Sequence, residues 1–248
     1  MQNRYVGDVG DFAKYGLLRL LISEGVFKLG LVWCLFGDEN HNSDGRHISY
    51  LQSDEFRALD PSLHDKLSRI VQSGRRSVNS ISQARILPPS TTYFSSSISS
   101  PNSQGGSSPE RIAYRNKWLS SAFDSTAACD LVFFDPDNGV ETASVLRHAP
   151  KAGKYIFWNE LVPFWQRGQS IIVYHHLNRT ASVQRQTEIL REKFSANFPD
   201  AAVSLHFLFR RGSCRHFWLV GQRDHFSWLS AGTRRVKKSG WSGFFEIG

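Results

Sequence analysis

The stretch that decides the fold class is Leu131-Val132-Phe133-Phe134-Asp135-Pro136-Asp137-Asn138. The run from Leu131 to Phe134 is short, apolar and continuous, as expected for a strand that is covered on both faces. In open α/β sheets, ligands bind beyond the carboxyl ends of the strands, so the Asp135 carboxylate is expected to project into that crevice. Pro136 fixes one backbone angle, and Gly139 permits a tight turn. The stretch therefore predicts a buried strand that ends at the working site.

Helices and strands are expected to alternate on both sides of this stretch. Apolar residues at helical spacing predict helices over Gly16–Phe27, Leu63–Val71, Glu110–Phe123 and Ser182–Phe198. Apolar runs predict further strands over Leu29–Phe36, Ser170–Tyr174, Ala201–Phe209 and Phe217–Val220. The last two are separated by Arg210-Arg211-Gly212-Ser213, which is typical of an antiparallel hairpin. The alternation predicts an α/β fold with a Rossmann-like, doubly wound, mostly parallel sheet and a C-terminal antiparallel hairpin.

The domain organisation is expected to be simple. A length of 248 residues suits a single α/β domain over residues 1–248, and 40% hydrophobic residues exclude wholesale disorder. A serine-rich stretch at about 90–109 predicts a mobile surface insertion. Residues at about 232–248 are expected to form a basic C-terminal tail.

Charge and cysteine content bear on partners and compartment. A formal net charge of +8 favours contact with a polyanion, and nucleic acid (DNA or RNA) is the expected partner; a merely soluble basic protein is the alternative. Cys34, Cys129 and Cys214 are far apart and lie in or beside apolar runs, which is typical of reduced thiols. No signal peptide and no bilayer-spanning run is recognised. A cytoplasmic protein without a membrane partner is therefore expected, and the oligomeric state is not predicted.

The residues after the buried strand carry the chemistry. Asp137 adds an acceptor and Asn138 adds a mixed donor and acceptor to the Asp135 carboxylate. Such a set can orient an exocyclic amine, a hydroxyl or a metal-bound water. The structural alternative is an Asx-turn, in which these side chains bond to their own backbone.

A second candidate segment lies near the N-terminus, at Gly7-Asp8-Val9-Gly10-Asp11-Phe12-Ala13-Lys14-Tyr15. Asp11 is expected to cap the helix that follows. Lys14 would fall in the first helical turn, where it opposes the helix dipole, so a contact with an anionic ligand group is expected. An ordinary capped helix start with a solvated lysine is the alternative.

This N-terminal segment resembles the opening of the adenine-N6 methyltransferases of large-subunit ribosomal RNA, which carry Gly-Asn-x-Ala-Asp-x-x-Lys-His. Gly7, Asp11 and Lys14 are in register with that motif, and Tyr15 stands at the histidine. The family's catalytic Asp-Pro-Pro-Tyr follows its fourth strand, and residues 135–138 are similar in position and in their first two residues. An Ile-x-x-Trp-like stretch follows in both, here ending at Trp158.

The resemblance implies a class I fold that uses S-adenosylmethionine as cofactor. It implies that Asp135 and Asn138 orient the accepting amine, with Pro136 and Asp137 beside them. It implies a cofactor site made of Gly7, Asp11, Lys14 and Tyr15 together with the loop Gly37, Asp38 and Glu39, which stands in place of the family's glycine-rich turn. Because Asn138 replaces the family's tyrosine, the aromatic partner of a flipped base is expected to be Trp158 or Tyr174.

A third group follows the strand over residues 170–174. Adjacent residues on a strand point in opposite directions, so at most one of His175 and His176 is expected to face the site. We take His175 as a candidate general base or metal ligand, and Arg179 as a phosphate contact. Together with the nearby carboxylates, this group allows an alternative function, a Mg- or Mn-dependent nuclease or phosphohydrolase, although no metal ligand is assigned.

Basic clusters provide the remaining candidates. Arg210 and Arg211 are expected to contact a nucleic acid. Arg234-Arg235-Val236-Lys237-Lys238 precedes several aromatic residues, a pattern that suits backbone contacts and base stacking. A basic hairpin tip and a solvated tail are the structural alternatives. A non-catalytic nucleic-acid-binding protein is thus a third possible function. The methyltransferase hypothesis requires Asp135 and Lys14 to share one crevice.

Overall fold

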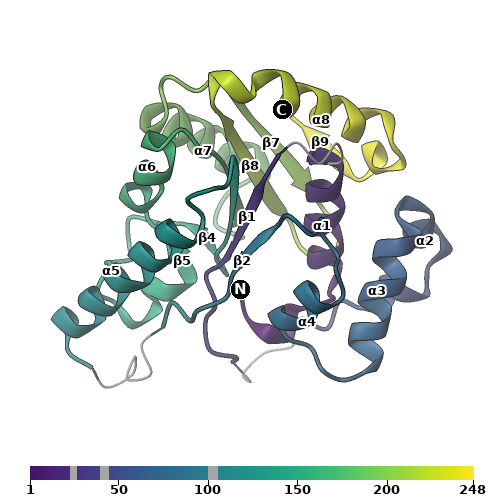
Figure 1. Ribbon diagram of the computed structural model, residues 1–248, viewed down its shortest axis with the longest axis horizontal. Coiled ribbons are helices and arrows are strands. Elements are labelled where there is room, and N and C mark those ends of the chain that lie inside the picture. Colours follow the sequence, from purple (N-terminus) through teal and green to yellow (C-terminus); the bar gives the residue numbers. More distant parts are fainter. Residues whose placement is uncertain (23–26, 40–44, 100–105) are drawn as a thin grey trace.

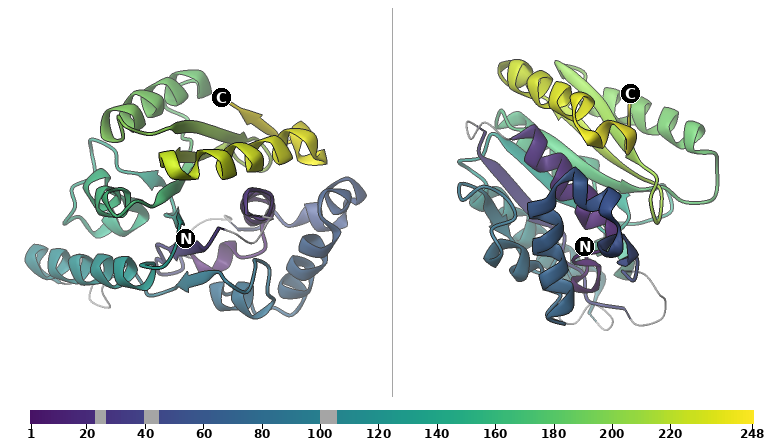
Figure 2. Two further views of the ribbon diagram at one scale, coloured as in Figure 1. Left: turned by 45° about the horizontal axis from the view of Figure 1, so that its top comes forward. Right: turned by 90° about the vertical axis from the view of Figure 1, so that its right-hand side faces the viewer.

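The computed structural model describes residues 1–22, 27–39, 45–99 and 106–248, and these form an α/β fold (Figures 1 and 2). The strands are β1 (Leu29–Trp33), β2 (Thr92–Phe94), β3 (Leu131–Asp135), β4 (Gly139–Val140), β5 (Tyr155–Ile156), β6 (Ser170–His176), β7 (Val203–Phe209), β8 (Arg215–Gly221) and β9 (Phe245–Ile247). The α-helices are α1 (Val9–Leu21), α2 (Asp54–Leu59), α3 (Pro61–Gln72), α4 (Val78–Gln83), α5 (Ser108–Ser125), α6 (Trp158–Gln166), α7 (Val183–Asn197) and α8 (Phe226–Lys238).

The main sheet of the described residues has seven strands in the order β2-β1-β3-β6-β8-β7-β9. Strands β2, β1, β3 and β6 pair in parallel, whereas β8 is antiparallel to β6 and β7, and β9 is antiparallel to β7. The α/β class, the parallel half and the β7–β8 hairpin are confirmed, although the sheet as a whole is mixed. The chain leaves β1 for β2 on one side and returns to β3 on the other. Ligand sites of open α/β sheets lie at such a reversal, beyond the strand ends.

Helices cover both faces of the sheet, because alternate residues of the buried strands point to opposite sides (Figure 1). Leu31 and Phe133 pack toward α1, α3 and α8. Val32 and Phe134 pack toward α5, α6 and α7. The expected burial of this strand on both faces is confirmed.

Helix α1 begins earlier than predicted. It starts at Val9, and the N-cap is Asp8, whose carboxylate accepts a hydrogen bond from the Asp11 amide at 2.9 Å. The predicted start at Gly16 and the predicted cap at Asp11 are therefore wrong. Capping at Asp8 satisfies a helix N–H that would otherwise have no partner. The helix ends at Leu21, and residues 23–26, which fall within the predicted range, lie outside the described residues.

Two predicted peripheral segments belong to the packed fold. Within the expected insertion at 90–109, residues 92–94 form β2, which pairs in parallel with β1; residues 100–105 lie outside the described residues. The expected basic tail at 232–248 instead contains the end of α8 and strand β9. Arg235 donates to the Leu20 and Leu21 carbonyl oxygens at the end of α1, and Trp241 and Phe245 are buried. These aromatic rings are core residues, because the sheet face around α1 would otherwise be open to water.

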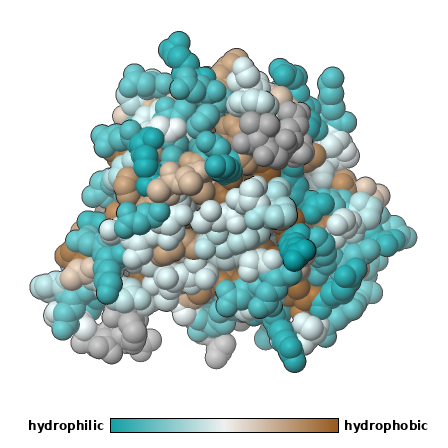
Figure 3. Space-filling view, in the orientation of Figure 1, coloured by the Kyte–Doolittle hydropathy of each residue, from teal (hydrophilic) through white to brown (hydrophobic). Residues whose placement is uncertain are grey.

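The described surface is mainly polar on the face shown in Figure 3. Leu146, Phe226 and Trp228 are the large apolar side chains that stand exposed among the described residues. Cys34, Cys129 and Cys214 are free thiols. None of the helices in the described part of the chain combines the length and apolar character needed to cross a membrane.

Candidate functional site

A cavity of about 290 Å³ lies at the carboxyl ends of β3 and β6. Its walls come from the start of α1, from the segment after β3, from the end of β6 with Arg179, and from the β7–β8 hairpin. Asp135 lines it because residues 131, 133 and 135 share the sheet face that α1 covers. The cavity thus lies beyond the carboxyl ends of the parallel strands, beside the reversal between β1 and β3.

Lys14 is held at the floor of this cavity between two carboxylates. Its Nζ lies 2.6 Å from Asp135 Oδ2 and 2.6 Å from Asp11 Oδ1. All three side chains are buried, with 3–4% of each exposed. The expectation that Asp135 and Lys14 share one crevice is confirmed. The alternative of a solvated lysine does not hold.

Burial sets the protonation of this cluster. It raises the pKa of Asp11 to about 6, although the Lys14 ammonium acts in the opposite direction. Burial also disfavours the Lys14 ammonium, but Asp11 and Asp135 together outweigh it and hold the pKa of Lys14 well above its ordinary value. Lys14 therefore stays charged, and Asp11 is a carboxyl that titrates close to neutral pH.

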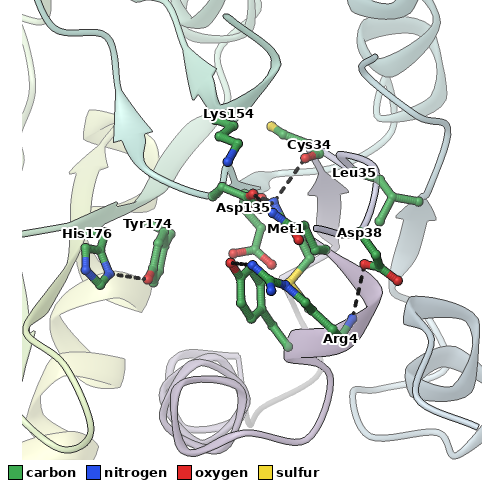
Figure 4. Close-up of polar contacts among 12 residues, drawn as sticks. Met1, Arg4, Cys34, Leu35, Asp38, Asp135, Lys154, Tyr174 and His176 are labelled. Carbon is green, nitrogen blue, oxygen red and sulfur yellow. Dashed lines mark hydrogen bonds and ion pairs between the residues drawn. The ribbon is translucent and has the colours of Figure 1, made fainter. Parts of the chain in front are cut away.

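The segment after β3 is fixed by contacts with distant residues rather than by an Asx-turn. The Asp137 carboxylate accepts from Gln2 Nε2 at 2.6 Å and lies 2.5 Å from the Met1 ammonium. That ammonium also donates to the Cys34 and Asp135 carbonyl oxygens, so it sits between the ends of β1 and β3 (Figure 4). Pro136 and Asn138 line the cavity beside Asp135.

The loop expected to bind the cofactor does not reach the cavity. Gly37, Asp38 and Glu39 are absent from its lining. Asp38 accepts from the Arg4 amide (Figure 4). Glu39 accepts from Lys154 Nζ at 2.5 Å. These acidic side chains are engaged within the fold.

Two other expected cofactor residues have structural roles. Gly7 has φ +81°, and its amide donates to Asp11 Oδ2 at 3.0 Å. Tyr15 is fully buried in the core. Of the N-terminal candidates, only Asp11 and Lys14 line the cavity.

His176, not His175, faces the cavity. His176 and Tyr174 line it, and the Tyr174 hydroxyl lies 3.2 Å from His176 Nδ1 (Figure 4). His175 points to the opposite sheet face, where its Nδ1 accepts from the Val140 amide at 3.2 Å. The expectation that only one of the pair faces the site is confirmed, but the choice of His175 is wrong.

The approach of His175 to β4 explains Gly139, and it yields a first prediction. Gly139 has φ +111°, and a Cβ there would lie 2.3 Å from His175 Nδ1. Gly139→Ala is expected to lower the free energy of unfolding by about 2 kcal/mol or more, since backbone strain and a steric clash combine. Gly74→Ala is the matched control, because Gly74 has φ +67° but open space around its Cβ position. If urea unfolding gives the same loss of free energy of unfolding for Gly139→Ala and Gly74→Ala, the clash with His175 is contradicted.

The basic candidates divide into one at the cavity and two away from it. Arg179 lines the cavity. Arg210 pairs with Glu246 at 2.6 Å, and the Arg211 guanidinium lies 5.2 Å from the centre of the Phe244 ring. These two arginines therefore contact the C-terminal segment rather than the cavity.

Trp158 does not reach the cavity either. It is the first residue of α6, on the far side of the sheet, and its ring lies edge-on to the Phe194 ring with the ring centroids 4.8 Å apart. Of the two aromatic residues expected to stack on a base, only Tyr174 lines the cavity.

The cavity also contains Arg215, which sequence reasoning did not select. Arg215 opens β8 and pairs in register with His176 of β6. It lies in the basic stretch of the hairpin, and its pairing with His176 is what distinguishes it from Arg210 and Arg211. Because this pairing joins two distant strands, the sequence around Arg215 does not indicate that it reaches the cavity.

The donor set argues against a divalent metal between the carboxylates. Lys14 Nζ already bridges Asp11 and Asp135, the position that a cation would take. Elsewhere in the described ranges, no three or more His, Cys, Asp or Glu side chains are grouped to hold a metal ion. The nuclease hypothesis gains no support from the geometry. Neither a scan of protein-family models nor a search of curated proteins finds a match for this chain.

Proposed function

We propose that this chain is an S-adenosylmethionine-dependent, methyltransferase-like enzyme that acts on a nucleic acid or nucleotide. One observation carries the proposal: Lys14 Nζ lies 2.6 Å from Asp135 Oδ2 across 121 residues of sequence, at the floor of one cavity. The two segments that resemble the methyltransferase family thus lie at one cavity beyond the ends of the parallel strands.

The chemistry of the cavity fits the cofactor in part. Asp11 and Asp135 share the Lys14 ammonium and Asp137 pairs with the Met1 ammonium, whereas Asp8 lines the cavity with a carboxylate that no ion pair among the described residues engages. S-adenosylmethionine carries a sulfonium and an ammonium that such a carboxylate complements. Asp8 and Asp11, with Lys14 beside them, are the residues that would hold it. The Gly37–Glu39 loop would not take part. When bound, the cofactor supplies an activated methyl group.

The residues of the chain would act by positioning and by proton management. The Asp135 carboxylate accepts a hydrogen bond from the substrate amine that receives the methyl group, and Lys14 fixes the orientation of that carboxylate. Asn138 lies beside it with a second acceptor. Asp11, with its pKa of about 6, can exchange a proton near neutral pH. The net charge of +8 favours a polyanionic substrate.

The test is calorimetric titration with S-adenosylhomocysteine, followed by transfer of labelled methyl groups from S-adenosylmethionine to single-stranded RNA and DNA. We expect saturable binding and transfer, with transfer lost in Asp135→Asn. Asp130→Asn is the matched control, because Asp130 precedes β3 at its other end and accepts from the Lys28 amide. The absence of both binding and transfer, or equal losses in the two variants, would contradict the proposal.

A further inference from the structure

Arg215 is a buried cation with unused hydrogen-bonding capacity. Its exposure is 3%, and it lines the cavity. Nη2 donates to Ser213 Oγ, but Nε and Nη1 have no hydrogen-bond partner within the described part of the chain. Among the residues that the structure describes, no carboxylate oxygen lies within 4.0 Å of this guanidinium. The other buried guanidinium in the described core, Arg115, is by contrast fully engaged with Glu160 and backbone carbonyls.

An unpaired guanidinium in this position is costly unless a ligand completes it. A buried donor without an acceptor loses its hydration and gains nothing in return. Because arginine stays protonated at any physiological pH, it cannot relieve this cost by becoming neutral. The three N–H groups on Nε and Nη1 therefore point to an oxyanion that is bound during function.

The surroundings of Arg215 suit an anion with more than one charge. His176 lies opposite Arg215 on β6, His47 approaches the same hairpin at Gly212, and Arg179 is a further cation in the cavity lining. The start of the 13-residue helix α1 also approaches the guanidinium, and helix N-termini favour anions. Gly10 makes this approach possible, because a Cβ at that position would lie 2.0 Å from Arg215 Nη1.

We propose that Arg215 is the centre of a phosphate-binding subsite, and that this subsite holds a phosphate group of the nucleotide unit whose base reaches Asp135. This rests on the proposed function, since it names the group through which the same cavity recognises its substrate. The cavity then has two chemically distinct walls. Arg215 faces phosphate, and the carboxylates of Asp11, Asp135 and Asp137 face cationic and amine groups. The Asp8 carboxylate lies near Arg215, since a Cβ at Gly10 would lie 3.0 Å from Asp8 Oδ1 and 2.0 Å from Arg215 Nη1.

The test compares AMP with adenosine by calorimetry, because the two ligands differ only in the phosphate. The wild-type protein is expected to bind AMP about 10- to 100-fold more tightly, the usual range for hydrogen bonds to a charged group. Arg215→Gln should abolish that preference. Arg210→Gln is the matched control on the same hairpin and should keep it. Equal affinity of the wild-type protein for AMP and adenosine would overturn the subsite.

A second variant keeps the charge but moves it. Gly10→Ala is expected to displace the guanidinium and to reduce the AMP preference while Arg215 remains in the chain. It also tests the phosphate subsite if Arg215→Gln fails to fold.

Binding of S-adenosylhomocysteine separates the phosphate subsite from the proposed function, because its affinity should be unchanged in Arg215→Gln. If that variant weakens S-adenosylhomocysteine and leaves the AMP preference intact, Arg215 binds the cofactor carboxylate and the phosphate subsite is refuted. An AMP preference without methyl transfer would instead refute only the proposed function.

Discussion

Lys14→Met is expected to lower the free energy of unfolding by about 3–5 kcal/mol at pH 8, the usual cost of removing one partner from a buried ion pair. The variant keeps most of the side-chain volume but leaves Asp11 and Asp135 buried without their shared cation. Two like charges would then face each other away from water. Urea unfolding followed by circular dichroism measures the loss.

The pH dependence of this loss distinguishes charge from packing. Lys14 lowers the pKa of Asp11, so that pKa should rise further above its unfolded value when Lys14 is removed, and the folded state should then bind protons more readily. The destabilisation should therefore be smaller at pH 5 than at pH 8, and Lys14→Met combined with Asp135→Asn should recover part of it. Lys117→Met, at an exposed position of α5, should cost no more than about 0.5 kcal/mol. A loss that is the same at both pH values would point to packing alone.

The segment around Asp135 could be predicted because its signal is local. A continuous apolar run bounded by Asp and Pro specifies a strand buried on both faces, and the position of its end fixes where Asp135 emerges. The sharing of one crevice by Asp135 and Lys14 was expected from the resemblance of their two segments to the methyltransferase family. The direct ion pair between them was not predicted, because Lys14 was expected to contact a ligand.

The positions of His176 and Arg215 in the cavity wall could not be predicted, because they depend on which face of each strand meets α1. Ile171, Ile172 and Val173 are all fully buried, so β6 carries no contrast between a polar and an apolar side. The sequence alternation therefore separates His175 from His176 but does not indicate which of them faces the cavity. Arg215 reaches the site only through its register with His176, and register is a tertiary property.

The C-terminal segment shows the opposite difficulty. Basic residues followed by aromatic residues are typical of nucleic-acid contacts, yet Trp241 packs on Phe12 of α1 with ring centroids 4.9 Å apart. Gly16 leaves the space that this ring fills, since a Cβ there would lie 2.3 Å from it. Composition alone does not distinguish an aromatic residue that awaits a base from one that covers a helix.

Acidification is expected to destabilise the fold through three histidines on the sheet face covered by α7, of which His206 and His216 are buried and His175 is half-buried. His175 and His216 are paired in register, and the His206 and His216 rings lie 4.6 Å apart. Burial, reinforced by neighbouring cationic groups, lowers the pKa of His175 and His216 to about 3 and that of His206 to about 4.

The direction of the effect follows from these lowered values. Because the unfolded chain takes up these protons from about pH 6.5 downward and the folded chain does not, stability is complete above pH 6.5 and falls as the pH drops toward 3. At pH 4 the loss from His175 alone is about 3 kcal/mol, at 1.36 kcal/mol for each pH unit. Asp11 acts in the opposite direction, since its folded pKa of about 6 is raised, but it is one group against three.

His216→Gln isolates this contribution, because glutamine does not titrate and its amide can still bond to Thr187 Oγ1, which His216 Nε2 contacts at 3.0 Å. Urea midpoints measured between pH 7 and pH 4 should fall less steeply in this variant than in the wild-type protein. His47 is exposed and is not one of these three histidines, so His47→Gln should leave the fall of the urea midpoint with pH unchanged. If the urea midpoints of His216→Gln and of the wild-type protein fall in parallel, His216 is not among the groups that take up protons on unfolding.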